Sequence, residues 1–228
     1  MRKLYPIAFA VVLLLTGGLT LVADEVVFSA DFDSMPETAG SYGEWEVSRG
    51  RLHQRDSGNR LAKINFSVPQ SGLMEYSFDV RYQGGGLEDR MGGFGVHVFA
   101  DRAHRGKSWG NGESYLLWIN YDENPSYGKA GFRGQVYRSF NHSWMELPES
   151  YDIPLDPKVL STENLRLSIP LKIQVDGRSG LVKVWDPTRR GTYIRFQLES
   201  APGEGRYFSL RSNSLALSFD NLRIRRIE

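Results

Sequence analysis

Apolar and polar residues alternate strictly over long stretches of the chain. Between Met74 and Tyr82 every second residue is apolar, and the intervening residues are polar or charged. Because successive side chains of a β-strand point to opposite faces, this period of two predicts a half-buried strand. A longer run from Leu165 to Val175 repeats the pattern, with Pro170 on its polar face. Proline lacks a backbone N–H, so we expect that strand to bend there or to lie at a sheet edge.

Two short segments near the ends of the chain carry similar patterns. Phe28–Asp33 reads Phe-Ser-Ala-Asp-Phe-Asp, and Leu217–Ile224 reads Leu-Ser-Phe-Asp-Asn-Leu-Arg-Ile. We expect both to be strands that pair with each other and close one domain. The apolar residues change phase after Phe219, which predicts a β-bulge near Asp220.

The rest of the chain is also strand-like, and no window shows the 3.6-residue period of a helix. The further candidates are Trp45–Leu52, Arg60–Phe66, Gly92–Ala100, Ser114–Tyr121, Phe132–Phe140, Thr192–Leu198 and Tyr207–Arg211, with a hairpin that turns at Asp176–Gly180. About a dozen strands without repeats or linkers predict a single all-β domain over residues 24–228. We expect a two-sheet antiparallel β-sandwich with jelly-roll connections.

Residues 1–23 are typical of a secretory signal peptide. Two basic residues precede an apolar stretch from Ile7 to Leu15, and a small residue, Ala23, follows. A Gly-Gly pair interrupts the stretch, which is shorter than the roughly 20 residues of a membrane-spanning helix. We therefore expect cleavage near Ala23 and no membrane anchor afterwards, the alternative being a retained anchor. The chain has no cysteine, which favours a bacterial periplasmic or extracellular location.

The charge of the chain argues against nucleic-acid binding. The formal net charge is +1, and removing residues 1–23, which hold two basic residues and no acid, lowers it to −1. Basic residues form only short clusters such as Arg189-Arg190 and Arg225-Arg226. Without a basic stripe, no nucleic-acid partner is expected.

Several short motifs, taken in order, resemble one large superfamily. The segment Trp45-Glu-Val-Ser-Arg-Gly-Arg-Leu52 follows the opening strand, and Tyr76–Val80 and Gly92–Val96 come next. Phe208–Asn213 and Phe219–Ile224 close the chain. Together they resemble the concanavalin A-like lectin/glucanase superfamily, in particular its laminin G-like bacterial members. The resemblance implies a sandwich with one concave sheet, on which relatives bind or cleave carbohydrate.

The central segment from Gly93 to Trp144 is rich in tryptophan and tyrosine, interspersed with amide and guanidinium side chains. Sugar recognition needs aromatic faces for pyranose rings and planar polar groups for hydroxyls. Alternation places candidates of both kinds on one face of each of three strands. These predicted ligand-binding residues are His97, Trp118, Asn120, Arg133, Gln135 and Tyr137. The alternative is that Trp118 and Phe99 belong to the sandwich core and the polar residues lie outside it.

Acidic residues raise two further questions, one of catalysis and one of metal binding. Retaining glycoside hydrolases need two carboxyl groups about 5 Å apart. Glu75 and Asp79 come nearest to such a pair, but they lie on the expected solvent face of their strand, which disfavours catalysis. Asp31, Asp33 and Asp220 would approach one another if the end strands pair, and could hold a structural calcium ion. The alternative is that Asp220 satisfies backbone donors at a bend; no other cofactor is expected.

Three functions follow from these patterns. The leading hypothesis is an exported, non-catalytic, lectin-like module that binds carbohydrate or another cell-envelope component. The second is a structural or assembly protein of the envelope or its appendages, because aromatic and arginine-rich surfaces also suit contacts with an envelope protein. The third is a glycoside hydrolase whose acid pair comes from different strands.

Overall fold

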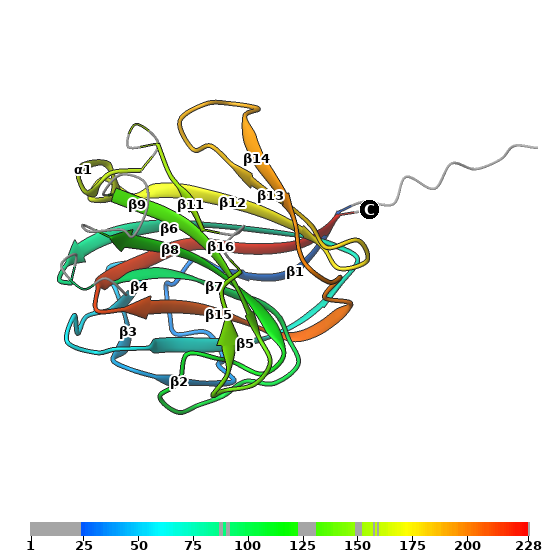
Figure 1. The fold of residues 1–228 in the computed structure, drawn as a ribbon. Coiled ribbons are helices and arrows are strands. Elements are labelled where there is room, and N and C mark those ends of the chain that lie inside the picture. Colours follow the sequence, from blue (N-terminus) through cyan, green and yellow to red (C-terminus); the bar gives the residue numbers. More distant parts are fainter. Residues whose placement is uncertain are drawn as a thin grey trace, which may run out of the picture.

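The computed structural model describes residues 24–86, 89, 92–122, 131–148, 152–156, 158 and 160–227. The predicted signal peptide, residues 1–23, lies outside the described residues. Within them the chain forms two antiparallel β-sheets of eight strands each, stacked as a sandwich, as the sequence predicts (Figure 1). In this part of the chain no helix is long and apolar enough to cross a membrane.

Sheet A contains the strands nearest to both ends of the described chain. Its order is β14 (Tyr193–Gln197), β13 (Leu181–Trp185), β12 (Ile169–Asp176), β6 (Leu73–Gly84), β16 (Ala216–Ile227), β4 (Arg51–Gln54) and β3 (Trp45–Ser48), with β1 (Glu25–Ala30) also paired to β16. β4 pairs with the first part of β16 and β1 with the last part, so the two short strands follow one another along it.

Sheet B contains the central segment of the sequence. Its order is β10 (Met145–Glu146), β9 (Gly131–Ser139), β8 (Ser114–Asp122), β7 (Gly93–Ala100), β15 (Glu204–Asn213), β5 (Ala62–Ser71) and β2 (Gly40–Tyr42), with β11 (Asp152–Pro154) also paired to β9. β7, β8 and β9 are therefore direct neighbours, which brings the three predicted binding strands side by side.

The predicted pairing of the end strands is confirmed. Phe28 of β1 lies opposite Ile224 of β16, and the two strands run antiparallel (Figure 1). The β-bulge near Asp220 is also confirmed, because the register of β16 against β6 shifts between Asp220 and Arg223. Asn221 takes a φ of 50° within the bulge. The shift lets the apolar residues before and after it point into the same core.

One predicted strand, Trp45–Leu52, is wrong because it is a hairpin of two strands. β3 and β4 pair with each other, and Arg49 and Gly50 connect them with φ angles of 53° and 67°. Two consecutive positive φ angles are typical of the tight turn that joins two twisted strands. The Ser-Arg-Gly-Arg sequence held this signal, but the continuous alternation on either side hid it.

The long predicted strand from Leu165 to Val175 is correct only in its second half. Leu165 instead ends the one-turn helix α1 (Thr162–Leu165), which Ser161 and Asn164 begin with a reciprocal capping box, and a turn follows at residues 166 and 167. β12 then begins at Ile169, after Ser168 with a φ of 76°. β12 is not an edge strand, because it lies between β13 and β6. β13 pairs only with Ile173–Val175, however, so Pro170 pairs with β6 alone among the described strands and its missing N–H breaks no bond with β13.

The core lies between the two sheets and is rich in aromatic rings. Tyr76 of sheet A stacks on Phe208 of sheet B, with ring centroids 5.5 Å apart and planes 13° from parallel. Phe28 of β1 contacts Phe66 of β5 across the sandwich at a tilt, with ring centroids 5.2 Å apart and planes at 43°. Burying such large apolar surfaces is the main stabilisation of a domain without disulfides.

Candidate functional site

The three predicted binding strands present their candidate side chains on one surface, the outer face of sheet B. Register places Trp118 opposite Gln135, Asn120 opposite Arg133, and Leu116 opposite both His97 and Tyr137. The intervening residues, among them Leu117 and Val136, point into the core. All six candidates therefore lie outside the core. Of the two aromatic residues that the alternative assigned to the core, Phe99 lies there and Trp118 does not.

Trp118 lies flat on this face because β7 offers it a floor of glycine. A Cβ atom at Gly93 would come within 2.9 Å of two indole atoms of Trp118. In β7, Gly93 and Gly95 thus lie on the side of Trp118 and leave room for it, while Phe94 between them points into the core. Trp109 packs edge-on against Trp118, with ring centroids 5.9 Å apart and planes at 83°. Trp118 is buried beneath it, while Trp109 is half-buried.

A loop of residues 101–113, which joins β7 to β8, covers part of the outer face of sheet B. We call it the covering loop. Its Asn111 amide donates to Asn65 Oδ1 at 2.9 Å and to Ser209 Oγ at 2.8 Å, both on strands of sheet B. The Asn111 side chain also accepts from the His104 backbone N–H at 2.7 Å, which fixes the loop upon itself. These polar groups are buried and satisfied, so the covering loop is part of the folded domain.

Two cations lie buried beneath the covering loop and are held by backbone carbonyls. Lys63 is 0% and Arg211 is 1% exposed. Lys63 Nζ donates to the carbonyls of Ser108 at 3.2 Å and Gly110 at 3.3 Å. Arg211 donates to the carbonyl of Trp109 at 2.6 Å and to that of Ser108 at 2.9 Å. Three consecutive carbonyls of the loop are thus held by two cations.

Burial changes the charge balance of this cation pair. Burial, followed by the neighbouring charge of Arg211, lowers the pKa of Lys63 to about 7. Burial likewise lowers the pKa of Arg211 to about 9. Arg211 Nε is buried and has no hydrogen-bond partner among the residues that the structure describes. Because dipoles of carbonyls compensate a cation less well than a carboxylate does, holding both charges here reduces stability.

His97 occupies the same buried cluster and is neutral. Arg211 Nη1 donates to His97 Nε2 at 2.7 Å, so Nε2 is an acceptor and the proton lies on Nδ1. Nδ1 then donates to Ser114 Oγ at 2.9 Å. Burial lowers the pKa of His97 well below its ordinary value, and the charges of Arg211 and Lys63 lower it further. His97 therefore positions Arg211 from beneath and is itself completely buried.

The other half of the outer face lies over β8 and β9, where Trp118, Asn120, Arg133 and Gln135 are also buried. Arg133 is buried and donates through Nε to Asp152 Oδ1 of β11 at 2.6 Å. Tyr137 is half-buried, and its hydroxyl donates to Gln135 Oε1 at 3.0 Å. Burial and the charge of Asp152 raise the pKa of Tyr137 to about 12. Tyr137 and Trp109, both half-buried, are thus the aromatic groups that this face offers to a ligand, and Gln135 lies buried beside Tyr137.

The predicted metal residues do not form one cluster. Asp220 lies on the outer face of sheet A and accepts from Arg51 Nη1 at 3.0 Å. Its other oxygen accepts from the backbone N–H of Asn221 at 2.7 Å, which agrees with the alternative of a satisfied bend. Asp31 accepts from the N–H of Asp33 at 3.4 Å. Among the described residues, no three His, Asp or Glu side chains are arranged to hold a metal ion.

Glu75 was expected on the solvent face but is buried, with 4% of its surface exposed. Lys172, Gln174 and Arg225 surround its carboxylate with hydrogen bonds. Burial alone would raise the pKa of Glu75, but these three donors together lower it. Asp79, the other acid of the nearest alternating pair, accepts from Asn221 at 2.8 Å on the same sheet.

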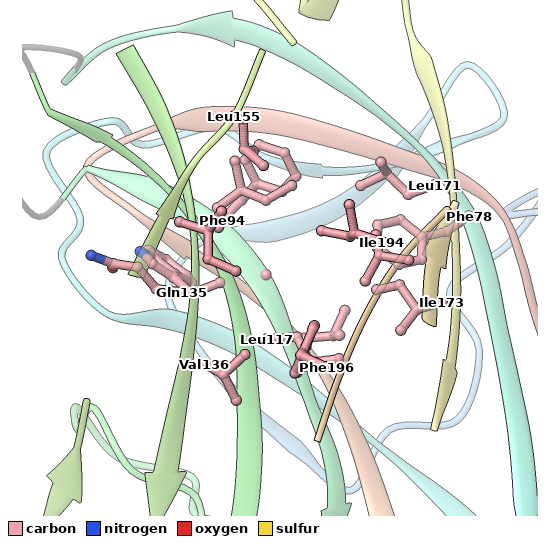
Figure 2. Close-up of a pocket in the computed structure, with 17 residues that line it drawn as sticks. Phe78, Phe94, Leu117, Gln135, Val136, Leu155, Leu171, Ile173, Ile194 and Phe196 are labelled. Carbon is pink, nitrogen blue, oxygen red and sulfur yellow. The ribbon is translucent and has the colours of Figure 1, made fainter. Parts of the chain in front are cut away.

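A separate apolar cleft opens between the two sheets at one side of the sandwich. Its volume is about 90 Å³, and Figure 2 shows Phe94, Leu117 and Val136 of sheet B facing Phe78, Ile173 and Phe196 of sheet A. The Gln135 side chain points away from it (Figure 2). Gly134 contributes space, because it is an inward position of β9 without a side chain. Ile153 and Ile194 also line the cleft and are 39% and 47% exposed.

Sequence reasoning missed Lys63, Asn65, Ser209 and Arg211, which complete the outer face of sheet B. Each occupies a polar position between buried apolar residues, so the alternation of β5 and β15 did place them outside the core. What the sequence could not show is that β15 and β5 continue the sheet beyond β7. The covering loop buries these residues, and its own sequence has no regular spacing of apolar residues from which its position could be predicted.

Comparison with known proteins identifies the fold. Neither a protein-family model nor a curated protein sequence matches the chain. Among solved structures, the carbohydrate-binding module CBM66 from Bacillus subtilis superposes with a TM-score of 0.53 at 16% identity, over 84% of this chain and 99% of that one. The legume lectin-like domain from Entamoeba histolytica gives 0.57 at 11% identity, over 89% and 98%. The fold is a concanavalin A-like jelly roll.

A third structure extends the range of jelly rolls that resemble this chain. The CBM2 module of the evolved Dit protein of Lactobacillus casei BL23 phage J-1 gives a TM-score of 0.58 at 9% identity, over 89% of this chain and 95% of that one. At such low identity the likeness concerns the course of the chain alone. The residues of the outer face must therefore be judged by their own chemistry.

Proposed function

We propose that this protein is an exported, non-catalytic, lectin-like module that binds carbohydrate through the outer face of sheet B. The observation that carries the proposal is the grouping of two half-buried rings, Trp109 and Tyr137, on one face of a jelly roll, with Trp118 packed beneath Trp109 and Gln135 bonded to the Tyr137 hydroxyl. Aromatic rings cover the apolar faces of pyranose sugars, and a planar amide bonds to their hydroxyls. Structural neighbours described as carbohydrate-binding modules and lectin-like domains support the same reading.

The buried cluster beneath the covering loop supports this proposal by fixing Trp109. Lys63 and Arg211 hold the carbonyls on both sides of Trp109 and its own carbonyl. The ring therefore stands ready before a ligand arrives. A preorganised aromatic group loses less conformational entropy on binding than a mobile one, and affinity rises accordingly.

A glycan array probed with the full-sequence protein tests the proposal. We expect retention of at least one class of glycan, and a loss of about tenfold or more in affinity for Tyr137→Ala, which removes the half-buried ring. Tyr193→Ala is the matched control, because Tyr193 is 43% exposed on sheet A. Absence of retention on every glycan, or equal retention by both variants, contradicts the proposal.

Export is the part of the proposal that rests on residues 1–23. β1 begins at Glu25, and the carboxylate of Asp24 accepts from Arg225 at 2.9 Å. Cleavage after Ala23 would therefore leave the sandwich complete. We expect the protein recovered from the periplasm or culture medium to begin at Asp24, as measured by intact mass. Recovery only from the cytoplasm with residues 1–23 attached contradicts export.

One observation favours a second function, an envelope assembly protein that acts through protein contacts. The apolar cleft between the sheets is bordered by the exposed side chains of Ile153 and Ile194, which suit an apolar side chain of a partner. Co-purification from the native envelope tests it. A stoichiometric protein partner that is lost with Ile194→Glu and retained with Tyr137→Ala would favour assembly over sugar binding.

A further inference from the structure

The outer face of sheet A carries a hollow that is distinct from the proposed sugar-binding face. Its volume is about 670 Å³, within the range of ligand pockets. Basic and polar side chains line it: Arg49, Arg51, His53, Arg55, Arg81 and Gln83. Because the two sheets lie back to back, this hollow and the outer face of sheet B open on opposite sides of the sandwich. We call it the arginine hollow.

Strand register explains how four arginines meet there. Arg51 and His53 alternate with the buried Leu52 on β4, so both point outward. Register places His53 opposite Ser218 of β16, and Ser218 opposite Arg81 of β6. Arg49 comes from the turn of the β3–β4 hairpin. Three separate stretches of the chain, the β3–β4 hairpin, β6 and β16, thus direct polar groups to one place.

One arginine of the hollow, Arg51, is fixed by hydrogen bonds to β16. Arg51 Nη1 donates to Asp220 at 3.0 Å, and Arg51 Nε donates to Ser218 Oγ at 2.9 Å. Burial lowers the pKa of Arg51, Asp220 raises it, and the charge of Arg81 lowers it again. Arg81 is therefore close enough to Arg51 for the two cations to repel.

The hollow carries more positive charge than its acids neutralise. Asp220 pairs with Arg51, and Glu46 pairs with Arg55. The side chains of Arg49 and Arg81 make no hydrogen bond or ion pair with any residue that the structure describes. Asp79 is a third acid near the hollow, because its charge raises the pKa of Arg51, and it accepts from the neutral amide of Asn221. Four guanidinium groups thus face three carboxylates, and Arg49 and Arg81 are the two that make no ion pair with a described residue.

We propose that the arginine hollow is a second binding site, which takes a sulfate or carboxylate group carried by an acidic saccharide. Guanidinium groups recognise such oxyanions through paired, charge-assisted hydrogen bonds. His53 and Gln83 are joined by a 3.0 Å contact at the same surface and add polar groups that suit hydroxyls. The size of the hollow admits a sugar ring together with its anionic substituent.

Titration with dextran sulfate, with neutral dextran and with sodium sulfate tests this site in the full-sequence protein. An ionic strength of about 0.01 M keeps screening weak. We expect dextran sulfate to bind and neutral dextran not to bind at this hollow. Sodium sulfate tests whether the hollow recognises the free anion as well as the anion carried by a saccharide. If sulfate at millimolar concentration competes with dextran sulfate, the charged group itself is recognised.

The double variant Arg49→Gln/Arg81→Gln removes the two guanidinium groups that make no ion pair with a described residue, and it breaks no described contact. We expect its affinity for dextran sulfate to fall by about tenfold or more, because hydrogen bonds to charged groups are strong. Arg189→Gln/Arg190→Gln is the matched control, since it removes two exposed charges from the β13–β14 connection on the same sheet. Its affinity should stay within about twofold of the wild type, as expected for charges remote from the ligand.

Three results would overturn the proposal: no binding of dextran sulfate at low ionic strength, an equal loss in both double variants, or tighter binding of a single-stranded DNA oligonucleotide than of dextran sulfate. Failure of this proposal can be distinguished from failure of the proposed sugar-binding face. Tyr137→Ala should leave dextran sulfate binding unchanged, and Arg49→Gln/Arg81→Gln should leave glycan-array retention by sheet B unchanged. Both variants should melt at the wild-type temperature.

Discussion

Burial of Lys63 predicts that the domain becomes more stable as the pH rises from 7 to 9. The pKa of Lys63 is about 7 in the folded protein, against an ordinary value of 10.5. Between these values the unfolded chain holds a proton that the folded protein has lost. A state that binds more protons becomes less stable, relative to one that binds fewer, as the pH rises. Raising the pH therefore destabilises the unfolded chain relative to the folded protein, and the free energy of unfolding increases.

The magnitude follows from the two pKa values. Each unit of pKa difference is worth about 1.4 kcal/mol, and integration from pH 7 to pH 9 gives a gain of about 2 kcal/mol. For a domain of this length that gain corresponds to a rise of about 4 to 8 °C in Tm. The other buried groups with shifted pKa values change the free energy of unfolding in other pH ranges. His97 does so below neutral pH and Arg211 above about pH 9. The raised pKa values of Tyr76 and Tyr137 make the folded protein less stable as the pH rises, but only in strong alkali.

Thermal unfolding followed by circular dichroism at pH 7, 8 and 9, at constant ionic strength, measures this effect. Lys63→Met removes the titrating group and should give a Tm that hardly changes over the same range. Lys107→Met is the control, because Lys107 is exposed on the covering loop and its loss should leave the wild-type rise. A flat wild-type profile, or an equal rise in Lys63→Met, would refute the reasoning.

Three further predictions concern other parts of the sandwich. Gly95→Ala should destabilise the domain by about 2 kcal/mol in urea unfolding, because the added Cβ would lie 2.1 Å from the carbonyl oxygen of Leu117. Gly84→Ala is the control and should be near neutral, since open space surrounds Gly84. Asp152→Asn should cost about 3 kcal/mol by leaving Arg133 buried without its counter-charge; Glu46→Gln, which breaks an exposed pair, should cost less than about 1 kcal/mol. A chelator should leave the melting temperature unchanged, and a clear fall would instead support the predicted calcium site at Asp31, Asp33 and Asp220.

Much of the fold could be predicted from local alternation. The bulge after Phe219 and the faces of β8 and β9 follow from which residues are apolar, and the structure has them in that arrangement. On β7 the alternation fails at Phe99, which has a φ of 55° and lies in the core rather than on the face of His97. The pairing of the end strands could be predicted as well, because their similar patterns lie at the limits of one domain.

The remaining features depend on contacts between distant residues, which alternation does not record. Lys63 and Arg211 were inconspicuous because a polar residue on an outward position normally meets solvent. The covering loop changes that environment, and no local pattern announces where a loop will lie. Likewise, the turn at Arg49 and Gly50 needs positive φ angles rather than a break in hydrophobicity, so the arginine hollow beside it could not be foreseen.

The pairing of the end strands also determines how the domain would respond to mechanical force. Glu25 lies opposite Arg226 at the outer end of the pair, and Ala30 lies opposite Leu222 at the inner end. A tensile load applied to the two ends of the chain would therefore open this pair one backbone hydrogen bond at a time, as a zipper opens. Strands pulled from opposite ends would instead load all their bonds together. If the domain is tethered at both ends, it should yield first at this corner, while the outer face of sheet B keeps its shape.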